Sequence, residues 1–165
     1  MKKLPSLLII AVIAISSLAA DEVRKTVYIG VTTASIENES MTEGVFGFGV
    51  DKIYSSCMLW GLHSEYSFGK LSDDTTNEND MVATIELDLK AGFVPFRDFS
   101  VFALVAGAGQ YIENDGAYGF GYGAGMDYAL SESIIFDVRY KTYSMKNTLL
   151  DYDYDKAVAS LRYKF

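Results

Sequence analysis

The chain has 165 residues and a formal net charge of −8, from 22 acidic and 14 basic side chains. Half of its residues are hydrophobic, 14% are aromatic, and there is one cysteine. The aromatic content excludes a disordered chain. A single cysteine excludes an intramolecular disulfide framework and a cysteine zinc site. The acidic balance argues against a nucleic-acid-binding module, and the length suits one domain.

The N-terminal segment 1–19 has the composition of a secretory signal peptide. Lys2 and Lys3 precede the apolar stretch 7–15, and Ser17 and Ala19 supply the small residues of a cleavage site. We therefore expect cleavage after Ala19 and a mature domain at 20–165. The alternative, a membrane anchor, needs about 20 apolar residues. Downstream, the longest apolar run is only 101–108. An exported chain without a spanning helix can cross a bilayer only as a closed β-barrel.

Hydrophobic and polar residues alternate with a period of two through most of the mature domain, which indicates strands. The pattern predicts eight of them, at 26–34, 44–51, 57–69, 82–93, 100–110, 117–129, 134–143 and 156–165. The connections 35–43, 70–81, 111–116 and 144–155 are polar and mostly longer, whereas 52–56, 94–99 (which holds Pro95) and 130–133 are shorter. Long loops at one rim and short turns at the other are typical of outer-membrane barrels. An even strand count then puts both termini at the short-turn, periplasmic rim.

Sorting these strands by alternate positions gives one face without a charge. We count 15 aromatic rings on that face, and on strand 100–110 the sorting assigns to it Phe102, Leu104, Ala106 and Ala108. The other face has the strand charges and 12 of the 14 glycines, Gly107 and Gly109 among them. A soluble lipocalin-like barrel would turn its apolar face inward. The interior of an eight-stranded barrel is only just wide enough for its side chains, so 15 rings do not fit there and must face lipid.

The polar face should line the lumen. Its charged residues are Glu65, Glu86, Asp88, Lys90, Asp127, Asp137, Arg139, Lys141, Lys156, Arg162 and Lys164. Buried charges must be paired, so we expect a ladder of salt bridges that blocks wide flow. A narrow or gated ion path is the alternative, because the polar lumens of larger barrels conduct.

The C-terminal end of the sequence has a further pattern. Leu161, Tyr163 and Phe165 alternate with polar residues and close on a terminal phenylalanine. This resembles the C-terminal signal of Gram-negative outer-membrane proteins, which the barrel-assembly machinery recognises. With the leader, the glycine run 119–125 and the eight segments, the whole mature chain resembles the small OmpA-type or opacity-type barrels of the porin family. The resemblance implies a monomeric barrel with a role in envelope integrity, surface contact or adhesion.

Three groups of residues have some features of chemical sites. The glycines of 119–125 are spaced strictly by two, unlike a nucleotide-binding loop, and indicate small residues where strands crowd the lumen. His63 and Ser64 are adjacent on a strand and point to opposite faces, so they form no nucleophile–base pair. Asp151, Asp153 and Asp155 form an acidic loop cluster that lacks the glycine and glutamate of an EF-hand but could hold a divalent cation more loosely.

Taken together, the sequence predicts an all-β, eight-stranded, antiparallel, up-and-down transmembrane barrel in the cell outer membrane. We expect a surface or structural protein, not an enzyme, with no catalytic residue, cofactor or metal centre. A narrow porin-like channel is the second hypothesis, a lipid-modifying barrel enzyme the third, and a soluble periplasmic carrier the non-membrane alternative. The expected partners are outer-membrane lipid and lipopolysaccharide, the barrel-assembly machinery, and divalent cations at an acidic rim of loop residues that includes Glu43. Cys57 is expected to be a small buried or rim residue.

Overall fold

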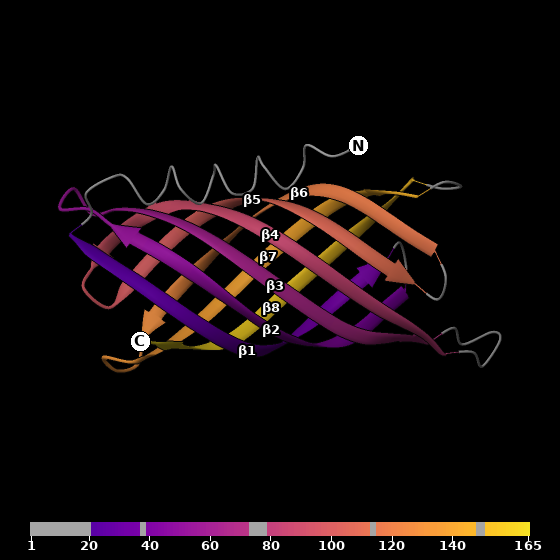
Figure 1. Cartoon of the computed structure of the whole chain (residues 1–165), viewed down its shortest axis with the longest axis horizontal. Helices are drawn as coiled ribbons and strands as arrows, with labels where there is room; N and C mark the ends of the chain where they lie inside the picture. The colour runs from indigo at the N-terminus through magenta and orange to yellow at the C-terminus, as the bar shows by residue number, and fades with distance from the viewer. Residues whose placement is uncertain (1–20, 37–38, 73–78, 113–114, 148–150) are drawn as a thin grey trace.

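The computed structural model describes residues 21–36, 39–72, 79–112, 115–147 and 151–165. These residues form a closed antiparallel barrel in which each strand pairs with the next and the last pairs with the first (Figure 1). The strands are β1 (Glu22–Ile36), β2 (Glu39–Ile53), β3 (Met58–Ser72), β4 (Asn79–Phe96), β5 (Phe99–Ile112), β6 (Asp115–Ala129), β7 (Ile134–Lys146) and β8 (Asp151–Lys164). No helix in these ranges is long and apolar enough to cross a membrane. The predicted fold class is confirmed.

The two rims of the barrel differ in the connections and chain ends that lie there. The connections β2–β3, β4–β5 and β6–β7 lie at one rim, which we call the turn rim, and both described ends of the chain lie there too. Asp21 donates its backbone N–H to Ile53 O at 3.0 Å, and Phe165 donates its own to Lys25 O at 3.1 Å. The opposite end, where β1–β2, β3–β4, β5–β6 and β7–β8 connect, is the loop rim. The barrel closes along β1 and β8, from Thr26 opposite Lys164 to Ile36 opposite Tyr154.

The strands are longer than the hydropathy pattern predicts. β2 begins at Glu39 instead of 44, β8 begins at Asp151 instead of 156, and β4 runs through Pro95, with a register shift between Phe93 and Phe96. Apolar–polar alternation marks only the part of a strand that touches lipid, whereas the hydrogen-bonded ladder continues past it. A strand of about 15 residues tilted by about 40° rises roughly 35 Å, more than the roughly 25 Å apolar band of such barrels. The predicted long loops are therefore partly strand.

The predicted orientation of β5 is wrong. Phe102, Leu104, Ala106 and Ala108 are buried in the lumen, while Val101 and Val105 are exposed on the outside. The prediction failed because β5 is apolar on both faces from Val101 to Gly109. Its two polar residues decide the orientation, since Ser100 donates to Asp127 and Gln110 donates to Thr84 inside the barrel. Gly107 and Gly109 consequently face outward, not into the lumen.

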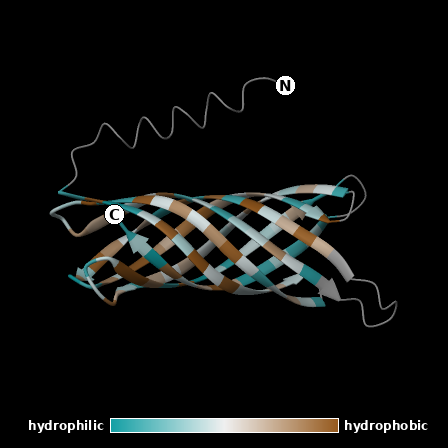
Figure 2. Cartoon of the chain, turned by 60° about the horizontal axis from the view of Figure 1, so that its bottom comes forward, coloured by the Kyte–Doolittle hydropathy of each residue, from teal (hydrophilic) through white to brown (hydrophobic). Residues whose placement is uncertain are grey.

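The other seven strands have the predicted orientation. Their apolar face is exposed or half-buried on the outside, with Phe120 79% and Ile29 70% exposed, and the alternation is visible along the strands in Figure 2. The charged face is buried inside. The side chains that could carry chemistry are therefore enclosed by the barrel wall.

Candidate functional site

The middle of the lumen is crossed by two lysines that share one carboxylate. Lys141 on β7 places Nζ 2.6 Å from Glu86 Oε2 and 2.8 Å from Asp88 Oδ2. Lys156 on β8 places Nζ 2.6 Å from Glu86 Oε1 and 3.1 Å from Glu65 Oε1. The acids come from β3 and β4 and the lysines from β7 and β8, so these pairs span the barrel from wall to wall.

A second group of charges lies closer to the turn rim. Lys90 Nζ is 2.5 Å from Asp127 Oδ2 and 3.6 Å from Asp51 Oδ2. His63 Nε2 is 2.8 Å from the other oxygen of Asp51. Gly49 makes room for the imidazole, because a Cβ at this position would lie 2.6 Å from His63 Cδ2. His63 is thus a buried partner of Asp51.

Arg139 joins the two groups. Its Nη2 is 2.8 Å from Glu65 Oε2 in the central group, and its Nε donates to Asp137 Oδ1 at 2.7 Å. Asp137 also accepts from Arg162 Nη2 at 2.8 Å. The ring of Tyr28 lies 5.1 Å from the guanidinium carbon of each arginine, a cation–π distance. The charges therefore form one continuous set of contacts.

We call this set the lumen network. Among the residues that the structure describes, it includes the ion-paired acids and bases Glu43, Asp51, Glu65, Glu86, Asp88, Asp127, Asp137, Lys90, Arg139, Lys141, Lys156 and Arg162. Every one of them is at most 4% exposed. Desolvating a charge costs several kcal/mol unless it is paired, and each of these bases contacts two or more acids.

Apolar side chains close the lumen on both sides of the network. Met41, Val82 and Met145 are buried near the loop rim, and Ile53 and Leu59 are buried near the turn rim. The rings of Tyr143 and Tyr154 stand 5.7 Å apart between the network and the loop-rim layer. Their hydroxyls donate to Glu86 and Glu43 respectively. An ion entering the barrel would meet an apolar layer first and fixed, paired charges next.

The glycine run on β6 makes room for these large side chains. A Cβ at Gly125 would lie 2.7 Å from Phe102 Cζ and 2.8 Å from Arg139 Cγ, and one at Gly119 would lie 2.6 Å from Met145 Sδ. Such distances are below any normal contact of a Cβ. The glycines therefore serve packing, as the sequence interpretation expects.

Most of the lumen charges predicted from the sequence come together in this network, with one exception. Lys164 lies at the turn rim with its side chain 33% exposed, and its Nζ is 3.7 Å from Glu22. Two members are absent from the predicted set: Glu43, which the sequence analysis places in the acidic loop rim, and Asp51, the last residue of the predicted strand 44–51. Both occupy lumen-facing positions of β2, in step with Val45 and the other alternate residues. Extending the alternation by one position at the N-terminal end of the predicted strand 44–51 reaches Glu43, and Asp51 is already its last lumen-facing position.

The remaining predicted residues lie on the outside. Asp151, Asp153 and Asp155 occupy successive outward positions of β8, so they are strand residues and not a loop cluster, and Asp151 pairs with Lys146 at 3.4 Å. Outward residues of a strand are about 7 Å apart, too far for one cation to bind all three closely. Nowhere in the described ranges do three metal-binding side chains converge.

Cys57 is exposed at the turn rim with φ 62°. The predicted assembly signal is exposed at the end of β8: Leu161, Tyr163 and Phe165.

A closed eight-stranded barrel with an apolar exterior and an ion-paired interior is the architecture of a small outer-membrane β-barrel. The model of the family described as "Outer membrane protein beta-barrel domain" matches residues 6–165, and the chain belongs to this family. The predicted resemblance is thereby confirmed at the level of the family.

Solved structures agree with this fold. The neisserial surface protein A is 13% identical, with a TM-score of 0.62, and the match covers 90% of this chain and all of that one. The attachment invasion locus protein of Yersinia pestis, Ail, is 13% identical, with a TM-score of 0.58 and coverage of 87% and 99%. Identities this low show the fold alone. No curated protein matches the chain in sequence.

Proposed function

We propose that this protein is a non-conducting surface and structural barrel of a Gram-negative outer membrane. The observation that carries the proposal is the filled lumen, in which the network spans the barrel and apolar side chains close it toward both rims. An ion moving through would have to displace buried, paired charges, and leaving one charge of such a pair without its partner costs about 3–5 kcal/mol. The barrel then acts through its exterior and its loop rim.

The negative charge at the loop rim limits which partners can bind there. Along β8 the outward residues Asp151, Asp153 and Asp155 are exposed or half-buried, and the whole chain is acidic. Ail has been solved with the heparin analogue sucrose octasulfate. An acidic flank repels such a polyanion, so here we expect contact with a basic surface, or with lipopolysaccharide through divalent cations.

An enzymatic function has little support. The only histidine bonds an aspartate in the lumen, and Ser64, its neighbour in sequence, faces the other side of the wall. A hydrolase nucleophile needs a base within hydrogen-bond reach, and the geometry of these two residues lacks that contact.

Single-channel recording tests the proposal. We would refold the protein, verify folding by the shift between unboiled and boiled samples on a gel, and insert it into planar bilayers beside a large-lumen porin as positive control. We expect no stepwise conductance from this protein. Reproducible steps from the folded fraction would overturn the proposal.

One observation favours a narrow cation path as the second candidate. Glu43 Oε1 and Asp88 Oδ1 are buried and accept no hydrogen bond from any group in the described part of the chain. In that case the recordings would show small, cation-selective steps, and Asp88→Asn would reduce them while leaving the heat-dependent gel shift intact.

A further inference from the structure

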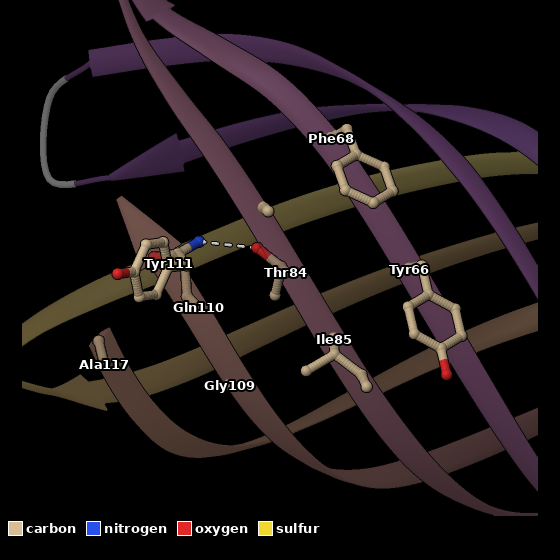
Figure 3. Close-up of a pocket in the computed structure, with 9 residues that line it drawn as sticks. Tyr66, Phe68, Thr84, Ile85, Gly109, Gln110, Tyr111 and Ala117 are labelled. Carbon is tan, nitrogen blue, oxygen red and sulfur yellow. Dashed lines mark hydrogen bonds between the residues drawn. The ribbon is translucent and has the colours of Figure 1, made fainter. Parts of the chain in front are cut away.

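A groove of about 370 Å³ runs along the outside of the barrel in the loop-rim half of β3, β4 and β5 (Figure 3). Tyr66 and Phe68 on β3 form one side, Tyr111 on β5 forms the other, and Ile85 and Gly109 lie between them. The groove is in the range of 300–1,000 Å³ typical of small-ligand sites.

Small residues between large ones create this hollow. Gly109 has no side chain to fill its outward position, and the nearest atom to a Cβ placed there would be Ile85 Cγ2, at 3.4 Å. Ala83 lies opposite Tyr111 in the β4–β5 register, so a small residue faces a large one again. The floor of the groove is therefore close to the backbone of β4 and β5.

The β3 wall is held in place by aromatic contacts. The rings of Phe46 and Tyr66 stack at 5.0 Å with planes 12° apart, and Phe46 stacks on Phe68 at 6.2 Å. Stacked rings lose little further freedom when a ligand packs against them. The groove is thus preformed on this side.

A positively charged side chain, that of Lys70, lies at the loop-rim end of the groove. Lys70 follows Phe68 on the same outward face of β3, opposite Met81 of β4. Lys70 is exposed and forms no ion pair with any side chain that the structure describes, whereas Lys146 on β7 is paired with Asp151. A molecule lying in the groove would bring its membrane-surface end to this ammonium group.

We propose that the groove binds one acyl chain of lipid A, with a lipid A phosphate at the Lys70 ammonium group. The groove is apolar, opens toward the lipid and lies in the loop-rim half, which faces the lipopolysaccharide leaflet when both chain ends are periplasmic. Charge complementarity selects a phosphorylated lipid on this flank. On the opposite flank the outward positions of β8 hold Asp153 and Asp155, whose carboxylates would repel phosphate. The inference goes beyond the proposed function and would stand even if the lumen conducted.

Native mass spectrometry of the full chain with diphosphoryl lipid A tests this site. Gly109→Leu fills the groove, and its matched control is Gly107→Leu, two residues away on the same outward face with no neighbouring atom closer than 3.9 Å. We expect Gly109→Leu to weaken lipid A binding about tenfold, equivalent to about 1.4 kcal/mol, while Gly107→Leu binds like the wild type. Gly109→Ala, which fills less of the groove, should fall between. The heat-dependent gel shift must be normal for each variant.

The headgroup is tested separately. Lys70→Gln should weaken binding of diphosphoryl lipid A and remove its advantage over monophosphoryl lipid A, whereas Lys146→Gln should leave both unchanged. Equal binding by the Gly109→Leu and Gly107→Leu variants would mean non-specific lipid contact and overturn the site. Equal binding of phosphatidylglycerol and lipid A by the wild type would overturn the assignment to lipid A.

Discussion

Lys141 on β7 and Glu86 on β4 lie on strands that are not paired in the sheet, yet Lys141 Nζ approaches Glu86 Oε2 to 2.6 Å. This contact crosses the interior of the barrel. Lys156, from β8, binds the second oxygen of the same carboxylate at 2.6 Å. The lumen is thus filled by bonds between opposite walls, and the stability of the barrel should depend on them.

The first prediction concerns this ion pair. Lys141→Met leaves Glu65, Glu86 and Asp88 with one cation fewer, and removing one partner of a buried pair costs about 3–5 kcal/mol. We expect a loss of that size in the free energy of unfolding by urea in lipid vesicles. Fluorescence of Trp60, the only tryptophan and an outward residue, reports the transition.

Lys146→Met on the same strand is the matched control. The Lys146–Asp151 pair is exposed, with side chains 59% and 68% accessible, and exposed pairs contribute about 0–1 kcal/mol. If Lys141→Met and Lys146→Met destabilise the barrel equally, the buried network does not have the structural importance assigned to it.

The second prediction compares two glycines on opposite faces of the wall. A methyl group at Gly125 would press on Phe102 and Arg139, so we expect Gly125→Ala to cost about 1–3 kcal/mol, as overpacking does. Gly107→Ala points outward, where the nearest atom is 3.9 Å away, and should be close to neutral. Urea unfolding measures both, and a neutral Gly125→Ala variant would contradict the packing role of the β6 glycines.

Sequence alternation predicted the wall of the barrel well because most strands combine aromatic residues on one face with charges or glycines on the other. It failed on β5, where both faces are apolar and only Ser100 and Gln110 mark the interior. That error also moved Gly109 to the wrong face, so the outer groove could not be predicted.

The contacts inside the lumen could not be predicted from the sequence, for a different reason. Which base meets which acid depends on the stagger of the closed barrel, and the alternation within a strand contains no information on that stagger. Lys141 therefore could be placed inside but not opposite Glu86. The lumen position of Glu43 could have been predicted from the sequence, since Glu43 continues the lumen-facing series of β2.

The third prediction concerns calcium. Asp153 lies opposite Ser144 and Asp155 opposite Thr142 on the outward face, and strand geometry spreads the carboxylates apart. We expect calcium to bridge them to lipopolysaccharide phosphate and not to form a site on the protein alone. In lipopolysaccharide vesicles, calcium at tenfold above its Kd would then stabilise the barrel by about 1.4 kcal/mol, with no effect in phosphate-free detergent.

The variant Asp153→Asn/Asp155→Asn should abolish this stabilisation, while Asp98→Asn at the turn rim should retain it. The midpoint of heat unfolding on gels is the measurement. A calcium shift of equal size in detergent would indicate a protein site instead of a bridge.

The fourth prediction concerns where the membrane ends on each flank. Outward apolar residues continue to the loop rim along β4 and β5, where Met81 is 64% and Tyr111 54% exposed, but on β7 they stop at Tyr140. Two residues of a tilted strand rise about 5 Å, so Ser144 lies about 10 Å above Tyr140 and should be outside the hydrocarbon. Val105→Arg, on the lipid face of β5, should cost about 2–4 kcal/mol, whereas Ser144→Arg should cost about 0–1 kcal/mol. Urea unfolding in vesicles, followed by Trp60 fluorescence, compares the two variants. Equal costs would place the loop end of β7 within the hydrocarbon and would require its hydroxyl residues, and the carboxylates of β8 beside them, to be shielded from lipid by a partner.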